Sequence, residues 1–585
     1  GTLGDNKYYK LVNDLSFDCD KSYVDTSLKN TLTSGTGFTP IGVGSYSFKS
    51  SFDGNNKKIY GLYMNDSSKG YAGFIGYSYF TGKNKYIVKN LSILDADVTL
   101  GADAGIVIGR VYYSYGSDGG YIENIKTSGK INCSGYCGGI VGEIDGVNKN
   151  YYAKNLVNKA DINSSNANTG GIIGRLNYIN VTNATNYGNI KSTSSYVGGV
   201  IGQASTDNKR HDGEIRNLEN HGNIEVKGSQ VGGVIGSASK YDIYDLKNYG
   251  EINIIEGMYT GGVLGELYYD TKVYNAYNYN KIKGKSRRIG GITGYMSGDS
   301  LLYNAYNYGD VEFITNDSTN TDIGGIVANM QKGFVMNCGN HGNVISNNSG
   351  SIGGIIGESN TYATNCYNYG NIINKQFENS QERKHIGGLV GSGIIKNSYN
   401  IGDIILDTSK YNGTDNYVGF LIGDPFGVYN SSNLFAVGNI TDNNAFGSDG
   451  NHYGVLFGST NKADDNFYVK GNISNLKYVN LDTSGYENGY ADIYSDAYQF
   501  KSYNDFSTKE PGIHYNLNNS PNKSTINLTE EYDFSKVNGM WFRDTLKLGD
   551  NWKYSNDYYP KLYKVLPNGS ISNELVEGQK DIVIK

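Results

Sequence analysis

The sequence has little proline, tryptophan or cysteine for its length. Its 585 residues include 6 prolines, 2 tryptophans and 5 cysteines. No proline lies between Pro40 and Pro425, so the central part of the chain can form backbone ladders without the missing donor that proline introduces. Five cysteines are too few for a disulfide framework in a chain of this size.

The chain also lacks a long apolar run and an excess of charge. No stretch approaches the roughly 18 apolar residues of a membrane span, and no basic and then apolar segment opens the chain. With 57 acidic and 51 basic residues, the net charge of -6 gives no electrostatic signature of binding to nucleic acid or an anionic membrane. We therefore expect no nucleic-acid partner and no membrane insertion. We also expect the sequence to be a segment of a longer chain.

Glycine and tyrosine are abundant instead, with 80 and 54 residues. One phrase, N-x-x-N-x-G-x-(I/V), recurs between about Asn155 and Asn433, as in NATNYGNI at Asn183. A second phrase lies between its copies, a glycine pair followed by two apolar residues and another glycine, as in GGVIG at Gly198. The period averages about 31 residues.

This repeat predicts an all-β fold. A unit of this length, with short apolar segments bounded by Gly, Asn or Ser, fits one coil of a β-solenoid. Paired glycines in every unit would cost a helix about 1 kcal/mol each. We predict a right-handed, single-stranded parallel β-helix at residues 51–475, an N-terminal cap at 1–50, and a C-terminal cap with an exit to a further module at 476–585, where the glycine pairs stop.

The second asparagine of the phrase recurs in ten consecutive units, and we predict that it forms a buried ladder at a corner of the coil. An amide can donate and accept along the stack, and asparagine tolerates the left-handed backbone that a corner needs. The small or apolar residue between the two asparagines should face the core. A polar ligand track is the alternative. The ladder residues are Asn158, Asn186, Asn220, Asn248, Asn278, Asn307, Asn340, Asn368, Asn400 and Asn433.

The two alternating phrases resemble the GLUG-type repeats of bacterial surface proteins, over about residues 40 to 475. Such repeats occur in adhesins and in the N-terminal regions of the IgA-specific zinc metalloendopeptidases of Gram-positive bacteria. The resemblance implies an extracellular β-helix, secreted or associated with the cell wall. It implies no activity, because enzymes and non-enzymes share the repeats.

The residue after the ladder asparagine is aromatic in seven consecutive units. If exposed, these rings form a stripe that could bind sugar faces or a protein hot spot, because tyrosine combines a large apolar face with a polar tip. Alternatively, the rings stack on one another and stabilise neighbouring coils. The candidate ligand-binding residues are Tyr187, His221, Tyr249, Tyr279, Tyr308, His341 and Tyr369.

The sequence offers no catalytic or metal-binding motif. None of the 6 histidines is followed by glutamate, so His-Glu-x-x-His is absent. His221 and His341 are four coils apart, roughly 19 Å, which is too far for one zinc ion. The column after the glycine phrases, from Glu143 to Asp424, has no acids in adjacent coils. We expect no metal, no cofactor and no catalysis by this chain, although long loops could assemble a site.

The cysteines suggest two local arrangements. Cys133 and Cys137 could pair. Cys338 and Cys366 occupy the same place in adjacent phrases, so we expect stacked thiols inside the fold, where a bridge is not required.

Three functions remain open. The leading hypothesis is a non-catalytic extracellular β-helix for adhesion or for recognition of a host glycan or glycoprotein. The second is the substrate-recognition or spacer region of a large zinc metallopeptidase, which a His-Glu-x-x-His motif downstream in the full gene would reveal. The third is a glycan-cleaving β-helix, which requires two carboxyl groups about 5 to 10 Å apart.

Overall fold

A computed structural model shows that the chain is an all-β parallel solenoid, as the repeat predicts. The one helix in the described part of the chain is the single turn α1 (Trp541–Asp544). The structure describes residues 6–17, 36–43, 46–66, 70–80, 86–101, 103–114, 119–146, 151–166, 168–206, 213–315, 321–347, 350–375, 384–407, 416–424, 431–442, 451–454, 467–474, 497–500, 531–532 and 537–584.

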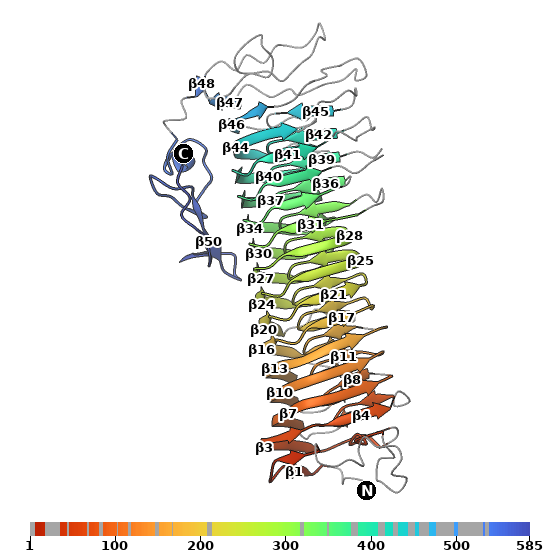
Figure 1. Ribbon diagram of the computed structural model, residues 1–585. Coiled ribbons are helices and arrows are strands. Elements are labelled where there is room, and N and C mark those ends of the chain that lie inside the picture. Colours follow the sequence, from red (N-terminus) through yellow and green to blue (C-terminus); the bar gives the residue numbers. More distant parts are fainter. Residues whose placement is uncertain are drawn as a thin grey trace. The chain divides into compact units, whose positions relative to one another are not determined.

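The chain forms two compact units, in each of which the strands stack coil upon coil (Figure 1). Unit 1 contains residues 1–273 and 277–280, and unit 2 contains residues 274–276 and 281–585. Strand β27 (Lys272–Asn278) is therefore divided between them.

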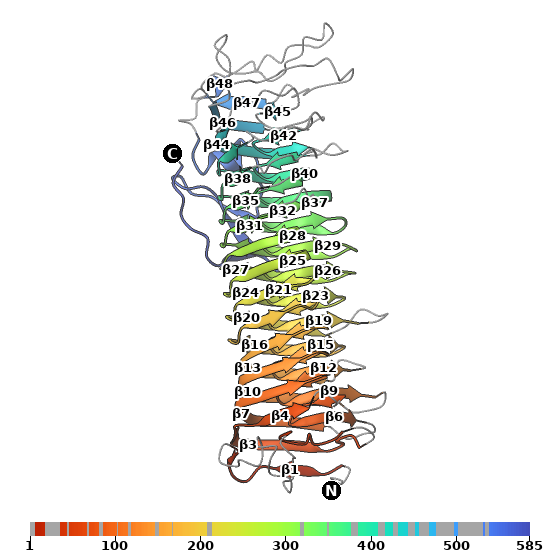
Figure 2. The same ribbon diagram turned by 45° about the vertical axis from the view of Figure 1, so that its right-hand side comes forward.

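Four rows of parallel strands build unit 1, and the fourth row runs through the labels β9, β12, β15 and β19 in Figure 2. The first row carries the asparagine phrase and contains β3 (Ser51–Tyr60), β7 (Tyr86–Leu100), β10 (Gly120–Cys133), β13 (Tyr151–Ser164), β16 (Asn180–Asn186), β20 (Glu214–Asn220) and β24 (Asp242–Asn248). Strands β7, β10 and β13 continue into the second row, which also contains β4 (Tyr63–Asp66), β17 (Ile190–Ser192), β21 (Ile224–Lys227) and β25 (Ile252–Gly261).

The strands in the third row of unit 1 hold the start of each glycine phrase. They are β5 (Tyr71–Ala72), β8 (Asp103–Gly105), β11 (Cys137–Gly138), β14 (Thr169–Gly170), β18 (Val197–Gly198) and β22 (Val231–Gly232). The fourth row contains β6 (Ile75–Phe80), β9 (Ile108–Tyr113), β12 (Val141–Asp145), β15 (Ile173–Asn177), β19 (Ile201–Ser205), β23 (Ile235–Ser239) and β26 (Leu264–Tyr268). Strands β1 (Tyr8–Lys10) and β2 (Leu15–Ser16) pair with β3.

Unit 2 repeats these rows. Its first row contains β30 (Leu301–Asn307), β34 (Phe334–Asn340), β37 (Ile356–Asn368), β40 (Val390–Asn400) and β44 (Ser432–Asp442). Its second row contains β28 (Ile282–Gly290), β31 (Val311–Phe313), β35 (Val344–Ser346), β38 (Ile372–Lys375) and β41 (Ile404–Asp407). Strand β28 also continues into the third row.

The third row of unit 2 also contains β32 (Asp322–Gly324), β36 (Gly350–Gly353), β39 (Lys384–Gly387), β42 (Asn416–Gly419) and β45 (Asn451–Gly454). The fourth row contains β29 (Thr293–Met296), β33 (Val327–Met330), β43 (Ile422–Asp424) and the first parts of β37 and β40. Beyond β44 follow β46 (Phe467–Ser474), β47 (Ala497–Phe500) and β48 (Glu531–Tyr532), each paired with the one before it.

Glycine is required directly after the third-row strand, where its backbone approaches the next coil and the asparagine ladder of the first row. A Cβ atom on Gly199 would lie 2.0 Å from the carbonyl oxygen of Gly233 and 2.3 Å from the side-chain carbon of Asn220. The glycine phrase therefore provides the close approach between coils and the contact with the asparagine ladder. Of the two residues between the asparagines, the first is fully buried in every described copy, from Leu156 to Ser398, as the sequence predicts.

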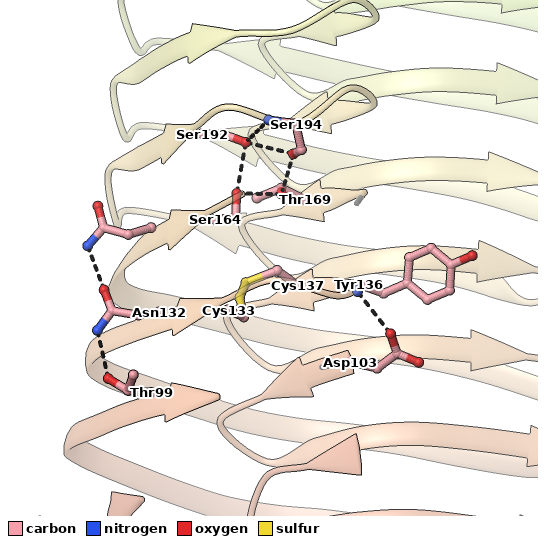
Figure 3. Close-up of a disulfide and its surroundings, with 11 residues drawn as sticks. Thr99, Asp103, Asn132, Cys133, Tyr136, Cys137, Ser164, Thr169, Ser192 and Ser194 are labelled. Carbon is pink, nitrogen blue, oxygen red and sulfur yellow. Dashed lines mark hydrogen bonds between the residues drawn. A yellow bond between two sulfur atoms is a disulfide. The ribbon is translucent and has the colours of Figure 1, made fainter. Parts of the chain in front are cut away.

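Cysteines and hydroxyls fill one corner of the first unit. Cys133 and Cys137 form a disulfide at the bend between β10 and β11 (Figure 3). In the next coil the same bend is closed by a hydrogen bond of 2.7 Å between the hydroxyls of Ser164 and Thr169. In unit 2, Cys338 and Cys366 are neighbours across β34 and β37, and both thiols are free and buried, as expected.

Residues 537–584 form a C-terminal module in unit 2. Strands β49 (Trp552–Lys553), β50 (Lys561–Val565) and β51 (Ile571–Leu575) pair antiparallel within it. The module packs against the first row of unit 2, where β50 contacts β30 and β34. The aromatic side chains at this contact are Trp541, Phe542, Trp552 and Tyr559 from the module, and Tyr367, Tyr399 and Phe435 from the solenoid.

Candidate functional site

The first asparagine of each phrase, which we call the outer asparagine, has a left-handed backbone. Its φ is 55° at Asn155, 57° at Asn183 and 56° at Asn217, and the same conformation recurs at Asn304 and Asn337. The prediction that the second asparagine has this conformation is therefore wrong. The left-handed residue interrupts the alternation of the strand, so the outer asparagine, which is exposed at Asn155, Asn183 and Asn217, directly precedes a buried core residue.

The second asparagine forms a continuous inner ladder in each unit. The amide nitrogen of Asn186 donates to the side-chain oxygen of Asn220 at 2.9 Å and to the carbonyl of Gly188 at 2.8 Å. These amides are fully buried. The ladder runs through Asn158, Asn186, Asn220, Asn248 and Asn278 in unit 1 and through Asn307, Asn340, Asn368 and Asn400 in unit 2.

Asn433 does not belong to this ladder. Strand register places Ala436 beside Asn400, and Asn433 has a φ of 55°. Its amide donates to the side-chain oxygen of Asn397 at 2.8 Å, so it is an outer asparagine. The prediction for Asn433 was wrong because the segment before β44 is longer by three residues than the phrase spacing assumed.

Aromatic rings form a continuous stack in unit 1, which we call the ring column. Tyr187 stacks on His221 at 4.7 Å, His221 on Tyr249 at 4.6 Å, and Tyr249 on Tyr279 at 4.8 Å between ring centroids. Tyr187 is 48% exposed and the other three rings are half-buried. Because neighbouring rings cover one another's faces, the column presents ring edges and hydroxyl groups to a ligand rather than broad faces.

The same column in unit 2 is engaged by the C-terminal module. The hydroxyl of Tyr308 donates to the carbonyl of Glu577 at 3.0 Å, and Tyr308 stacks on His341 at 4.7 Å. Tyr369 turns edge-on to His341 and shares a hydrogen bond of 2.8 Å with Tyr399. Burial and the nearby Lys580 lower the pKa of His341 to about 4. These three predicted site residues are therefore internal contacts of unit 2.

The outer asparagines of unit 2 bind the backbone of β50, which lies beside β30 and β34 (Figure 1). Asn304 donates to the carbonyl of Val565 at 2.9 Å and accepts its N–H at 3.0 Å. Asn337 donates to the carbonyl of Tyr563 at 2.6 Å. Sequence reasoning missed this role, because the asparagine phrase gives no sign of which backbone will dock on it.

A polar cluster lies near the glycine phrases of unit 2. Arg288 pairs with Asp322 at 3.3 Å, and Asn329 donates to Asp322 at 2.8 Å. Burial, together with the charge and hydrogen bond of Asp322, raises the pKa of Glu358 to about 7. The column after the glycine phrases could not predict this pair, because Asp322 belongs to the third row and Glu358 to the fourth.

This carboxyl pair does not have the spacing of a glycosidase. Retaining and inverting enzymes hold their two carboxyl groups about 5 to 9.5 Å apart, so that a sugar or a water fits between them. Asp322 and Glu358 are close enough for the charge and hydrogen bond of Asp322 to raise the pKa of Glu358, and Arg288 pairs with Asp322. The cluster is therefore a polar contact between coils.

The remaining candidate residues do not assemble a metal site. Among the described residues, no helix is long and apolar enough to cross a membrane, and no group of three His, Cys, Asp or Glu side chains could hold a metal ion. His221 lies between two tyrosine rings and 3.4 Å from the Glu219 carboxylate.

Comparison of the chain with models of protein families, with curated proteins and with solved structures gave no match.

Proposed function

We propose that this chain is a non-catalytic recognition region that binds a host glycoprotein or glycan through one face of unit 1. This face, which we call the recognition face, consists of the outer asparagines Asn155, Asn183 and Asn217 and the ring column Tyr187, His221, Tyr249 and Tyr279. The observation that carries the proposal is the contrast between units. The equivalent residues in unit 2 are engaged by the C-terminal module, whereas those in unit 1 are exposed or half-buried.

An extracellular location is part of the proposal. The Cys133–Cys137 disulfide favours an oxidising compartment, because cytosolic thiols are kept reduced. The free thiols of Cys338 and Cys366 are buried and need no such compartment. The resemblance to GLUG-type repeats supports a secreted or wall-associated bacterial protein. The same resemblance supports the alternative that the chain is a substrate-recognition or spacer region of a zinc metallopeptidase. A His-Glu-x-x-His motif in the remainder of the gene would favour this alternative.

A binding array of host proteins and glycans tests the proposed function. We expect the wild-type chain to bind at least one class of ligand, and Tyr187→Ala/Tyr249→Ala/Tyr279→Ala to lose that binding. Tyr308 is unsuitable for this test because it contacts the module. Tyr46→Ala is the matched control, since this ring is 72% exposed and lies outside the recognition face. Binding that survives the triple substitution would refute the proposal.

A further inference from the structure

The docking of β50 in unit 2 shows what ligand this kind of face accepts. Four backbone carbonyls of one segment accept hydrogen bonds from four of five consecutive coils: Pro560 from Tyr399, Tyr563 from Asn337, Val565 from Asn304 and Pro567 from Tyr274. The segment therefore runs along the coil stack, against the direction in which the coils follow one another.

The lengths of the two elements agree. The four coil steps from Asn275 to Asn397 extend over roughly 19 Å at about 4.8 Å per step, and the seven residue steps from Pro560 to Pro567 over roughly 23 Å at about 3.3 Å each. One segment therefore bonds to four of these five coils, and the coil of Asn365 is not among them. All four side chains donate to a carbonyl, and only Asn304 also accepts an N–H, that of Val565.

The outer asparagines of unit 1 have the same donors available. The amide of Asn155 donates to Asn124, that of Asn183 to Asn155, and that of Asn217 to Asn183, each at 3.0 Å. Each amide nitrogen carries two hydrogens, so one N–H per coil remains. Within the described residues this second N–H has no protein acceptor. In unit 2, Asn304 keeps its bond to Asn275 and uses the second N–H for Val565.

The side chains next to these asparagines differ between the units. Two positions after the outer asparagine, unit 2 has Tyr306, Gly339, Tyr367 and Tyr399. The three tyrosines are fully buried, and Tyr367 and Tyr399 contact Trp552 of the module. Beside Asn155, Asn183 and Asn217, unit 1 has Val157, Thr185 and Glu219 at this position, all half-buried, and the next coils have the half-buried Lys247 and the buried Tyr277. An aromatic core like that of the module would leave these polar groups poorly solvated. The face of unit 1 therefore suits a single strand with polar side chains.

We infer that the recognition face of unit 1 binds an extended polypeptide segment with polar side chains, held along the coil stack through its backbone carbonyls by Asn155, Asn183 and Asn217. This inference rests on the proposed function and specifies its ligand class. A glycan ligand at the same face is the competing outcome.

The test uses the full chain and two labelled peptides, with binding followed by fluorescence anisotropy. One peptide has the sequence of residues 557–569, and in the other Leu562, Val565 and Leu566 are replaced by serine. We expect both to bind with a stoichiometry of one, and the serine peptide to bind at least as tightly. Loss of one neutral hydrogen bond of about 1 kcal/mol corresponds to about a 5-fold weaker affinity.

The decisive variant is Asn155→Gly/Asn183→Gly/Asn217→Gly, because glycine adopts the left-handed backbone and removes only the amide. We expect its affinity for both peptides to fall about 100-fold or more. Asn163→Gly, an exposed asparagine on β13 outside the face, should bind like the wild type. Circular dichroism confirms that each variant is folded.

Two results would overturn the inference. One is peptide binding that is unchanged in the triple glycine variant. The other is the absence of peptide binding while chitohexaose or an array glycan binds and is lost in the tyrosine variants; in that case the proposed function stands and its ligand class is wrong. Failure of every array ligand and of both peptides would refute both proposals together.

Discussion

Acid should weaken the docking of the C-terminal module through His341. Its half-buried ring packs against Tyr308 and Tyr369, with Lys580 of the module nearby, and its pKa is about 4. In the detached state the pKa returns to about 6.5. The docked form therefore binds a proton less readily, so docking is at full strength above about pH 6.5 and weakens as the pH falls toward about 4. At pH 5 the loss is about 2 kcal/mol, roughly a 30-fold change in the docking equilibrium.

The assay is tryptophan fluorescence during urea unfolding. Both tryptophans of the chain lie in the module, where Trp541 is 5% exposed and Trp552 2%. Their emission reports detachment. We expect the midpoint of this transition to fall by about 1 M urea between pH 7.5 and pH 5. His341→Gln has no imidazole to protonate, so its midpoint should fall much less. An equal fall in the variant and the wild type would refute this role of His341.

Three further predictions concern the solenoid. Asn220→Ala should lower the free energy of unfolding in urea by about 2 to 3 kcal/mol, because it leaves buried partners in two neighbouring coils without hydrogen bonds. Gly199→Ala should cost about 3 kcal/mol or more, whereas Gly70→Ala, whose Cβ would meet nothing within 4 Å, should leave the circular dichroism melt unchanged. Because the Glu358 carboxyl is held protonated, its contribution to the melting temperature should decline as the pH rises from about 4.5 through about 7. Measured as a difference from the wild type at each pH, the melting temperature of Glu358→Gln should therefore rise over this range, and that of Glu225→Gln should stay level.

The repeat was sufficient to predict the fold and the inner ladder, because both depend on residue types that recur in every coil. Asparagine is favoured both in left-handed turns and in side-chain ladders, so the two asparagines of a phrase satisfy the same sequence rules. Only the backbone shows that Asn183 has the turn conformation and Asn186 the ladder position. For the same reason, and because the segment before β44 is longer, Asn433 was predicted in the ladder although it is an outer asparagine.

The contact between the C-terminal module and the solenoid could not be read from the phrase. Asn304 and Val565 are 261 residues apart, and their hydrogen bonds involve the backbone of β50 rather than a recognisable side-chain partner. One signal was present in the sequence. The column two residues after the outer asparagine has Thr185, Glu219 and Lys247 in unit 1 and three tyrosines in unit 2, of which Tyr367 and Tyr399 contact Trp552 of the module.

The two asparagine ladders have opposite electrical directions. In the inner ladder each amide donates toward the next coil, as Asn186 does to Asn220, whereas an outer amide donates toward the preceding coil, as Asn217 does to Asn183. Aligned amide dipoles polarise one another along a row. Because the two rows oppose each other, adding a whole repeat lengthens both of them, and the amide dipole that it adds to one row opposes the one that it adds to the other.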